Sequence, residues 1–361
     1  MVSFFYTYGR IKTEGDKKMQ HEITTKKRLL NPDGTLSEPG YSKKLILDYD
    51  RKDIKANSLR IKEWDYYLIA NDKFALALTI ADNSYMGLDS VSFLDFESKW
   101  HHTKSYMSFM TKGKKQLPDN SSYGDVISNG KGYSLKFLND GKKRVLYANL
   151  NNFMTDVKLV AMVELTDEPK ETMVIATPYK EDKKAFYYNQ KINCIKASGY
   201  VEFNKTRYEF AKTDSCAVLD WGRGVWTYKN TWYWGSASGY INEIPFGFNI
   251  GYGFGDVSHA SENMVIYNGK AHKLDIVEFI IPVKNGKDDF LSPWKFTSND
   301  KRFEMDFMPI LDRASCTSLG VIKSDQHQVF GRFSGFVILD NNEKVVIKDF
   351  LGFAEKVFNK W

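Results

Sequence analysis

Cysteine is scarce in this chain of 361 residues, which contains three: Cys194, Cys216 and Cys316. Their number is odd, their spacing is wide and no CxxC pair occurs, so the sequence indicates neither a zinc knuckle nor a disulfide framework. The six histidines form no HExxH or HxH pattern, and no GxSxG or SxxK signature of a common hydrolase is present. We therefore expect neither a metal nor a cofactor.

Long apolar runs and clustered charge are also lacking. No apolar run approaches the roughly 20 residues that span a bilayer, so we expect no transmembrane segment. The net charge of +6 comes from short groups such as Lys112, Lys114 and Lys115. Because nucleic-acid binding usually needs a clustered basic stripe, we expect no nucleic-acid partner.

The first 18 residues lack the features of a signal peptide. The segment MVSFFYTYGR has no basic region followed by a long apolar stretch. Together with the sparse cysteines, this predicts a cytoplasmic protein. We expect residues 1–18 to be a disordered extension and the first domain to begin at Met19.

Aromatic residues, by contrast, make up 15% of the chain, and large rings suit sheets and binding pockets. Turn residues repeatedly separate two apolar runs, most clearly at Asn268-Gly269. On this basis we expect four strand–turn–strand units, over residues 66–80, 135–147, 264–274 and 336–347. Strands at this spacing predict a mainly β fold with antiparallel barrels or sandwiches.

The best helix candidate lies at the C-terminus. Apolar residues there recur at spacings of three and four, typical of one helix face. They are Phe350, Phe353, Ala354, Val357, Phe358 and Trp361. We predict a C-terminal helix that covers one end of a sheet or barrel.

A weak internal repeat divides the chain. Trp64 leads through a hairpin and an apolar strand to Asp82, and Trp234 leads through a turn and an apolar strand to Asp256. Chance similarity between amphipathic strands is the alternative explanation. Taken as a duplication, the pattern predicts two similar β domains, over residues 19–195 and 196–361.

The richest aromatic stretch covers residues 219–240. Four of the eight tryptophans lie in it: Trp221, Trp226, Trp232 and Trp234. If residues 231–240 form a strand, alternation places Trp232 and Trp234 on one face. The following stretch, residues 246–255, alternates large apolar residues with a face made mostly of glycine. Space for a bulky ligand and close packing by a neighbouring side chain are both explanations for such a face.

Polar residues near these aromatics are candidates for chemistry and ligand binding. Asp220, Asp256 and Glu262 are candidate proton donors, and Arg223 is a candidate for orienting a substrate. Structural explanations stand beside these: Asp220 and Arg223 as partners at a barrel corner, and Asp256 as a turn residue. The further candidates for ligand binding are Asn249, Asn263, Tyr66, Asp82 and Tyr85.

Several longer segments are distinctive motifs. They include KEWDYY (62–67), TIADNSYMG (79–87), LDWGRGVWTYKNTWYWGSASG (219–239), GFNIGYGFGD (247–256) and QHQVFGRFSG (326–335). On these motifs the chain resembles the bacterial and fungal DUF2804 family over residues 19–361. That family has no assigned activity, so the resemblance implies none.

More remotely, the layout is similar to the lipocalin-like double-barrel proteins, which include carotenoid hydratases and tocopherol cyclases. This resemblance implies two lipocalin-like antiparallel β-barrels and an apolar, isoprenoid- or polyketide-like ligand. It carries over no catalytic residue, and fold analogy does not establish function.

Three functions fit these observations. The first is an enzyme of the hydratase, isomerase or cyclase type that acts on a hydrophobic small molecule without a redox cofactor. The second is a carbohydrate-active enzyme with tryptophan platforms and a pair of carboxylates. The third is a non-enzymatic lipid- or pigment-binding protein. The sequence makes no prediction of the oligomeric state.

Overall fold

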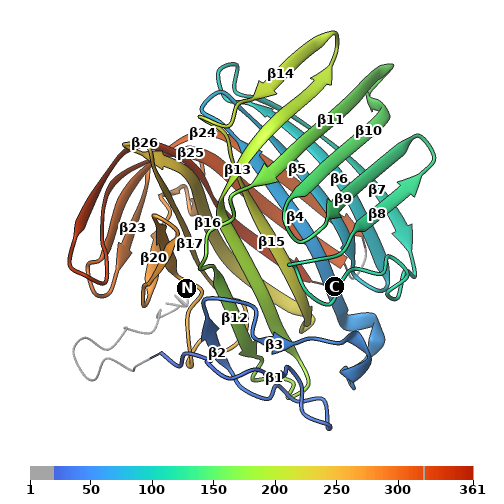
Figure 1. Cartoon of the computed structure of the whole chain (residues 1–361), viewed down its shortest axis with the longest axis vertical. Coiled ribbons are helices and arrows are strands. Elements are labelled where there is room, and N and C mark those ends of the chain that lie inside the picture. Colours follow the sequence, from blue (N-terminus) through green and yellow to red (C-terminus); the bar gives the residue numbers. More distant parts are fainter. Residues whose placement is uncertain (1–19, 320–321, 361) are drawn as a thin grey trace, which may run out of the picture.

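The computed structural model describes residues 20–319 and 322–360. The extension expected over residues 1–18 lies outside this part of the chain. The described residues form strands and two short 3-10 helices, η1 (Arg51–Asp53) and η2 (Ser58–Arg60). Two large antiparallel sheets dominate the structure (Figure 1), which confirms the predicted mainly β fold.

The first sheet has thirteen strands. Its main path runs in the order β7 (Trp100–Phe109), β6 (Met86–Asp95), β5 (Phe74–Asp82), β4 (Ile61–Ala70), β15 (Cys216–Val225), β13 (Phe186–Phe203), β11 (Val157–Thr166), β10 (Arg144–Met154), β9 (Tyr133–Asn139) and β8 (Val126–Gly130). Off this path lie β14 (Thr206–Phe210), β12 (Met173–Pro178) and β2 (Gly40–Ser42). The sheet curls so far that β7 and β10 come into contact.

The second sheet has nine strands. Their order is β19 (Lys270–Lys273), β18 (Met264–Tyr267), β17 (Ile244–Tyr252), β16 (Lys229–Ile241), β26 (Lys344–Lys360), β25 (Ile322–Ile338), β24 (Phe303–Leu319), β23 (Trp294–Ser298) and β20 (Val277–Ile280). Two small ladders complete the described structure: β1 (Lys27–Arg28) with β3 (Leu47–Asp48), and β21 (Val283–Lys284) with β22 (Lys287–Asp288).

The four predicted hairpins are confirmed as β4–β5, β9–β10, β18–β19 and β25–β26. The two large sheets meet where β13 and β15 of the first contact β16 of the second (Figure 1). The chain passes from one sheet to the other between Val225 and Lys229. The proposed boundary between residues 195 and 196 lies within β13, and the division into two domains stays a prediction.

The predicted C-terminal helix is wrong: residues 344–360 form β26, which pairs with β25 and β16. Phe353 packs on the Trp234 side of the sheet, whereas its neighbour Ala354 belongs to the apolar core on the other side. A strand that is buried on both faces carries apolar residues at odd and even positions. This double burial produced apolar spacings of three and four that imitate a helix.

The glycine face of β17 is explained by close packing. A Cβ atom at Gly247 would lie 2.7 Å from the Cys194 sulfur of β13, and one at Gly251 would lie 2.8 Å from Glu262 Oε1. Both distances are shorter than ordinary van der Waals contact. The glycines therefore let β13 and the segment before β18 approach this strand, and they leave no space for a ligand.

Candidate functional site

A cavity of about 620 Å³ lies between the two large sheets. The first sheet contributes residues of β4 to β7, β13 and β15, and the second contributes residues of β16 and β24 to β26. This volume falls in the range of pockets that bind a small organic molecule. We refer to it as the intersheet cavity.

Strand alternation decides which side chains reach this cavity. On β4, Trp64 and Tyr66 line it. Their neighbour Asp65 points to the opposite face, where its carboxylate accepts a hydrogen bond of 3.0 Å from Arg223. The first sheet thus has a cavity face and an opposite face, and residues two apart in a strand lie on the same face.

An ion pair lies on the cavity face where β13 meets β15. Lys191 Nζ is 2.7 Å from Asp220 Oδ2, and the Asn189 amide donates a hydrogen bond of 2.7 Å to Asp220 Oδ1. Lys191 is 1% exposed and Asp220 is 7% exposed. The lysine and the amide thus hold the Asp220 carboxylate in a fixed position on the cavity face.

A second carboxylate, Glu355 of β26, enters the cavity from the other sheet. Its oxygens accept hydrogen bonds of 3.0 Å from Trp232 Nε1 and from the Gln328 amide. Burial raises the pKa of Glu355 to about 7, against the opposing effects of the Trp232 hydrogen bond and the Lys191 charge. Glu355 can therefore hold a proton near neutral pH.

A third carboxylate, Glu262, lies behind the cavity wall. Trp234 Nε1 donates a hydrogen bond of 2.6 Å to Asn249 Oδ1, and the Asn249 amide donates to the Glu262 backbone oxygen at 2.9 Å. Burial raises the pKa of Glu262 to about 7 as well, although the Lys191 charge opposes the shift. Glu262 does not line the cavity. It is connected to the cavity residue Trp234 by the hydrogen bonds of Asn249.

Aromatic rings form one wall of the cavity. Trp226 makes edge contacts with Trp64 at 5.6 Å and with Trp232 at 5.1 Å between ring centres, and Tyr187 stacks on Phe254 at 4.7 Å. Within the described structure, Trp226 Nε1 and the Tyr187 hydroxyl make no hydrogen bond. Buried polar atoms normally have partners, so these two are exceptions in the wall of the cavity.

The packing of this wall depends on Gly222 of β15. The Trp64 ring lies directly over this residue and occupies the position that a Cβ atom would take. The neighbouring motif residues Trp221 and Arg223 point to the other face of the sheet. The DWGRG motif thus supplies one cavity residue, Asp220, and a glycine that admits the Trp64 ring.

The structure brings five of the proposed site residues together in the intersheet cavity. They are Asp220, Trp226, Trp232, Trp234 and Tyr66. Asn249 and Glu262 lie directly behind this group. The tryptophan-rich stretch therefore does supply much of the cavity wall, as its density of aromatic residues suggested.

Other proposed site residues have structural contacts outside the cavity. Arg223 binds Asp65 and stacks 4.2 Å from the centre of the Trp221 ring. Asp256 accepts a hydrogen bond from the Ser258 backbone at 3.0 Å, as expected for a turn residue.

Three more proposed ligand-binding residues also lie elsewhere. Asp82 accepts hydrogen bonds from Ser84 and Thr111 on the face of the first sheet that points away from the cavity. Asn263 accepts a hydrogen bond of 2.7 Å from the Gly251 backbone. Tyr85 packs 4.0 Å from the ammonium group of Lys62, measured to the ring centre.

Several cavity residues were not among the sequence candidates: Lys191, Glu355, Gln328, Arg313 and Tyr187. Lys191 and Tyr187 lie in a segment rich in polar side chains between apolar neighbours, and that signal was sufficient to select them. Glu355 was hidden because its segment had been interpreted as a packing helix. Gln328 lies in the distinctive QHQVFGRFSG segment but was not selected from it, and no local pattern distinguishes Arg313.

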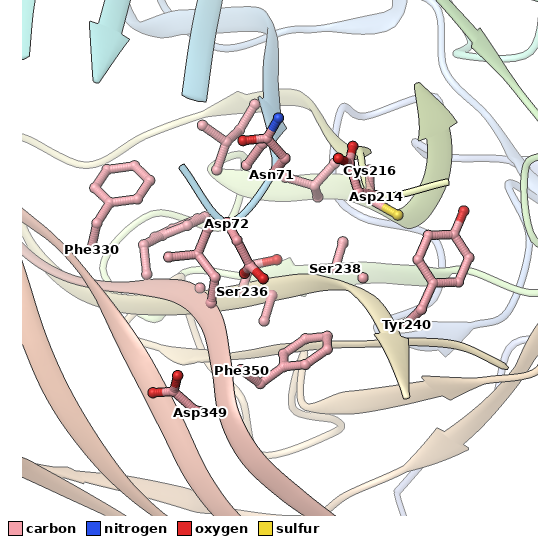
Figure 2. A pocket seen from close by; sticks show the side chains of 18 of the residues that line it. Asn71, Asp72, Asp214, Cys216, Ser236, Ser238, Tyr240, Phe330, Asp349 and Phe350 are labelled. Carbon is pink, nitrogen blue, oxygen red and sulfur yellow. The ribbon is translucent and has the colours of Figure 1, made fainter. Parts of the chain in front are cut away.

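A second cavity, of about 310 Å³, lies at another part of the junction between the sheets (Figure 2). The Tyr240 hydroxyl faces the Cys216 thiol there. Burial raises the pKa of Cys216 to about 11, so the thiol stays neutral and unreactive. Asp72, another lining residue, is bound to Arg332 at 2.7 Å. We therefore place the candidate site in the larger cavity.

Among residues 20–319 and 322–360, no group of three or more His, Cys, Asp or Glu side chains is placed to hold a metal ion. In the same part of the chain, no helix has the length and apolar character of a membrane span.

The sequence matches the model of the family described as domain of unknown function DUF2804 over residues 20–361. The chain belongs to this family. A comparison with curated proteins gave no match.

Three solved structures are similar to this chain. An AttH-like protein from Nitrosomonas europaea has a TM-score of 0.52 at 10% identity, over 86% of this chain and 96% of that chain. Kievitone hydratase from Nectria haematococca has a TM-score of 0.46 at 10% identity, over 93% of this chain and 98% of that chain. CghA in complex with Sch210972 has a TM-score of 0.43 at 10% identity, over 92% and 97% of the two chains. The AttH-like structure, with a TM-score above 0.5, shares its overall fold with this chain.

Proposed function

We propose that this protein is an enzyme that binds a small, largely hydrophobic molecule in the intersheet cavity and changes it by proton transfer. The reaction class is addition or elimination of water, isomerisation or cyclisation. One observation carries the proposal: two carboxylates with different contacts line the same cavity, Glu355 with its raised pKa and Asp220 paired with Lys191. Two carboxylates in one pocket can divide the roles of acid and base when one of them holds a proton near neutral pH.

Glu355 is the proposed proton donor because its raised pKa keeps a proton available near neutral pH. Transfer of that proton to a carbon–carbon double bond of the substrate would leave a carbocation, which the Trp232 ring in the cavity can stabilise. This assignment replaces Asp256 and Glu262, neither of which lines the cavity.

Asp220 is the proposed base. It would accept a proton either from a water molecule that adds to the cation or from the carbon next to it. In both cases one proton enters the substrate and one leaves, so no external oxidant or reductant is needed. The Lys191 ammonium, 2.7 Å from Asp220, holds the carboxylate in place.

The ionisable groups also bear on the other two functions. A protein that only stores a lipid or pigment has no use for a proton donor and a carboxylate in one pocket. A carbohydrate-active enzyme does need two carboxylates, and the presence of Glu355, Asp220 and tryptophan rings in one cavity keeps this as the second candidate. A cytoplasmic location remains a prediction from the sequence.

Native mass spectrometry of the purified protein, followed by extraction, would identify a bound small molecule. On that molecule or its precursor, Glu355→Gln and Asp220→Asn should each lower kcat at least 100-fold, the usual effect of losing a general acid or base. The matched controls are Glu278→Gln, at an exposed position, and Asp306→Asn, whose side chain is 72% exposed. Turnover that survives both cavity substitutions would refute the proposed roles.

A further inference from the structure

Six polar side chains form one continuous row across the cavity face of the first sheet. Cross-strand pairing aligns each residue with the next, from β13 at one end to β7 at the other. In order they are Lys191, Asp220, Tyr66, Thr79, Ser90 and Ser105. All six line the intersheet cavity. With a strand spacing of about 4.8 Å, the row is about 24 Å long. We call it the polar row.

The row changes in character along its length. Lys191 and Asp220, at the inner end, form a nearly buried ion pair whose charges cancel. The remaining four side chains carry neutral hydroxyl groups. Their exposure increases from buried Tyr66 to exposed Ser105 on the edge strand β7. The row therefore leads from the open side of the cavity to the proposed base, and most of it is uncharged.

An apolar row runs beside it on the same face. Trp64, Ala81 and Leu88 are aligned by the same pairing, each two residues away from a member of the polar row. All three line the cavity. Trp64 continues into the aromatic wall through its edge contact with Trp226. On the cavity face of the first sheet, a row of hydroxyl groups therefore runs parallel to a row of apolar side chains.

Hydroxyl groups on this face are unexpected for sheet packing alone. Faces that two sheets turn toward each other are normally apolar, because their side chains interdigitate to form a core. The Tyr66 hydroxyl, which neighbours Gln328, makes no hydrogen bond of standard geometry with the described residues. Hydroxyl groups on this face favour a ligand that brings hydrogen-bonding groups of its own over a purely apolar one.

We propose that the natural ligand is a neutral glycoside, an apolar ring system that carries a sugar. The sugar hydroxyl groups would pair with Tyr66, Thr79 and Ser90, and the ring system would lie on Trp64 and the aromatic wall. The hydroxyl part of the row carries no charge, so it suits the hydroxyl groups of a sugar better than a phosphate or a carboxylate. Arg313, which also lines the cavity, lies outside the row and donates a hydrogen bond of 3.0 Å to Ser92 Oγ. This inference rests on the proposed function, since it takes the intersheet cavity as the substrate site.

Two probes separate the sugar from the ring: 2-naphthol and 2-naphthyl β-D-glucopyranoside. Their binding to the full chain can be measured by isothermal titration calorimetry. The glucoside should bind at least tenfold more tightly than the naphthol. The double variant Thr79→Val/Ser90→Ala should reduce this advantage at least fivefold and leave the affinity for 2-naphthol unchanged.

The matched control is Thr206→Val/Ser134→Ala, at partly or fully exposed positions of the same sheet outside the cavity. It should keep the full preference for the glucoside. Circular dichroism melting curves of both double variants would show that they fold, so that a lost preference is assigned to the missing hydroxyl groups.

Two results would overturn the inference. If the wild-type protein binds both probes equally and Trp226→Leu weakens both, the cavity binds apolar rings without using the polar row, and the proposed function stands while the glycoside does not. If neither probe binds, the glycoside class is excluded. The roles of Glu355 and Asp220 are then still decided by turnover of the co-purified ligand, which is independent of these probes.

Discussion

The ammonium group of Lys191 lies 3.8 Å from the centre of the Trp234 ring, and this contact joins the two large sheets. Lys191 belongs to β13 and Trp234 to β16. The same ammonium group neutralises Asp220, so one buried lysine serves both the junction of the sheets and the proposed base.

Lys191→Met should therefore lower the free energy of unfolding by about 3–5 kcal/mol, because it leaves the Asp220 carboxylate buried without its cation. Urea unfolding followed by tryptophan fluorescence would measure the change. Adding Asp220→Asn should recover part of the loss, since the uncompensated charge is then gone. Lys196→Met on the same strand is the control: its ion pair with Asp167 is exposed and should contribute less than about 1 kcal/mol. Equal losses at both lysines would contradict the interpretation.

The raised pKa of Glu355 predicts how activity depends on pH. The proposed donor is active when protonated, so kcat/KM should fall about tenfold per pH unit above about pH 7. Glu262→Gln should keep this fall, because Glu262 lies behind the cavity wall. A rate that is constant from pH 6 to 9 would argue against Glu355 as the acid.

The same shift has a consequence for stability. The pKa of Glu355 rises from 4.5 in the unfolded chain to about 7 in the folded protein. Below pH 4.5 the group is protonated in both states and costs nothing. Between pH 4.5 and 7 the unfolded state loses its proton first, so stability falls as pH rises. Glu355→Gln should remove roughly 3 kcal/mol of this fall. Urea titrations at pH 4.5 and pH 8 would measure the difference, and identical pH dependence in both proteins would contradict it.

Gly222→Ala should destabilise the protein by about 1–3 kcal/mol, because its methyl group would occupy the space of the Trp64 ring. Thermal denaturation would detect the change. In a Trp64→Leu background the same alanine should cost much less, since the smaller side chain leaves room for it. If the cost is the same in both backgrounds, the clash with Trp64 is not its cause.

The strand β26 predicts different outcomes for two phenylalanines that a helix would have placed on one apolar stripe. Phe353 is 1% exposed and packs on Trp234, so Phe353→Ala should cost about 3–5 kcal/mol. Phe358 is only partly buried and lies near Lys229 and Lys323, so Phe358→Ala should cost less than half as much. Equal costs, measured by urea unfolding, would not fit the strand.

Much of the fold follows from local patterns. Turn residues such as Asn268-Gly269 predicted the hairpins, because a two-residue turn fixes the pairing of the strands on either side. Alternation along residues 231–240 placed Trp232 and Trp234 on one face, and both line the cavity. The hairpins and the shared face of Trp232 and Trp234 both depend on residues that are close in sequence. Such local patterns can be recognised in a single sequence.

The composition of the site depended on pairing between distant strands. Lys191, Asp220 and Glu355 come from β13, β15 and β26, and only the order and register of strands in the two sheets brings them to one cavity. The pairing register of strands that are distant in sequence cannot be predicted from local sequence patterns. The helix predicted from Phe350 onward is wrong for a related reason: a strand covered on both faces loses the alternation that identifies strands. The sequence by itself determined β structure, turns and an aromatic wall. Tertiary structure decided which carboxylates share a cavity, because burial and cross-strand contacts exist only after the two sheets have packed together.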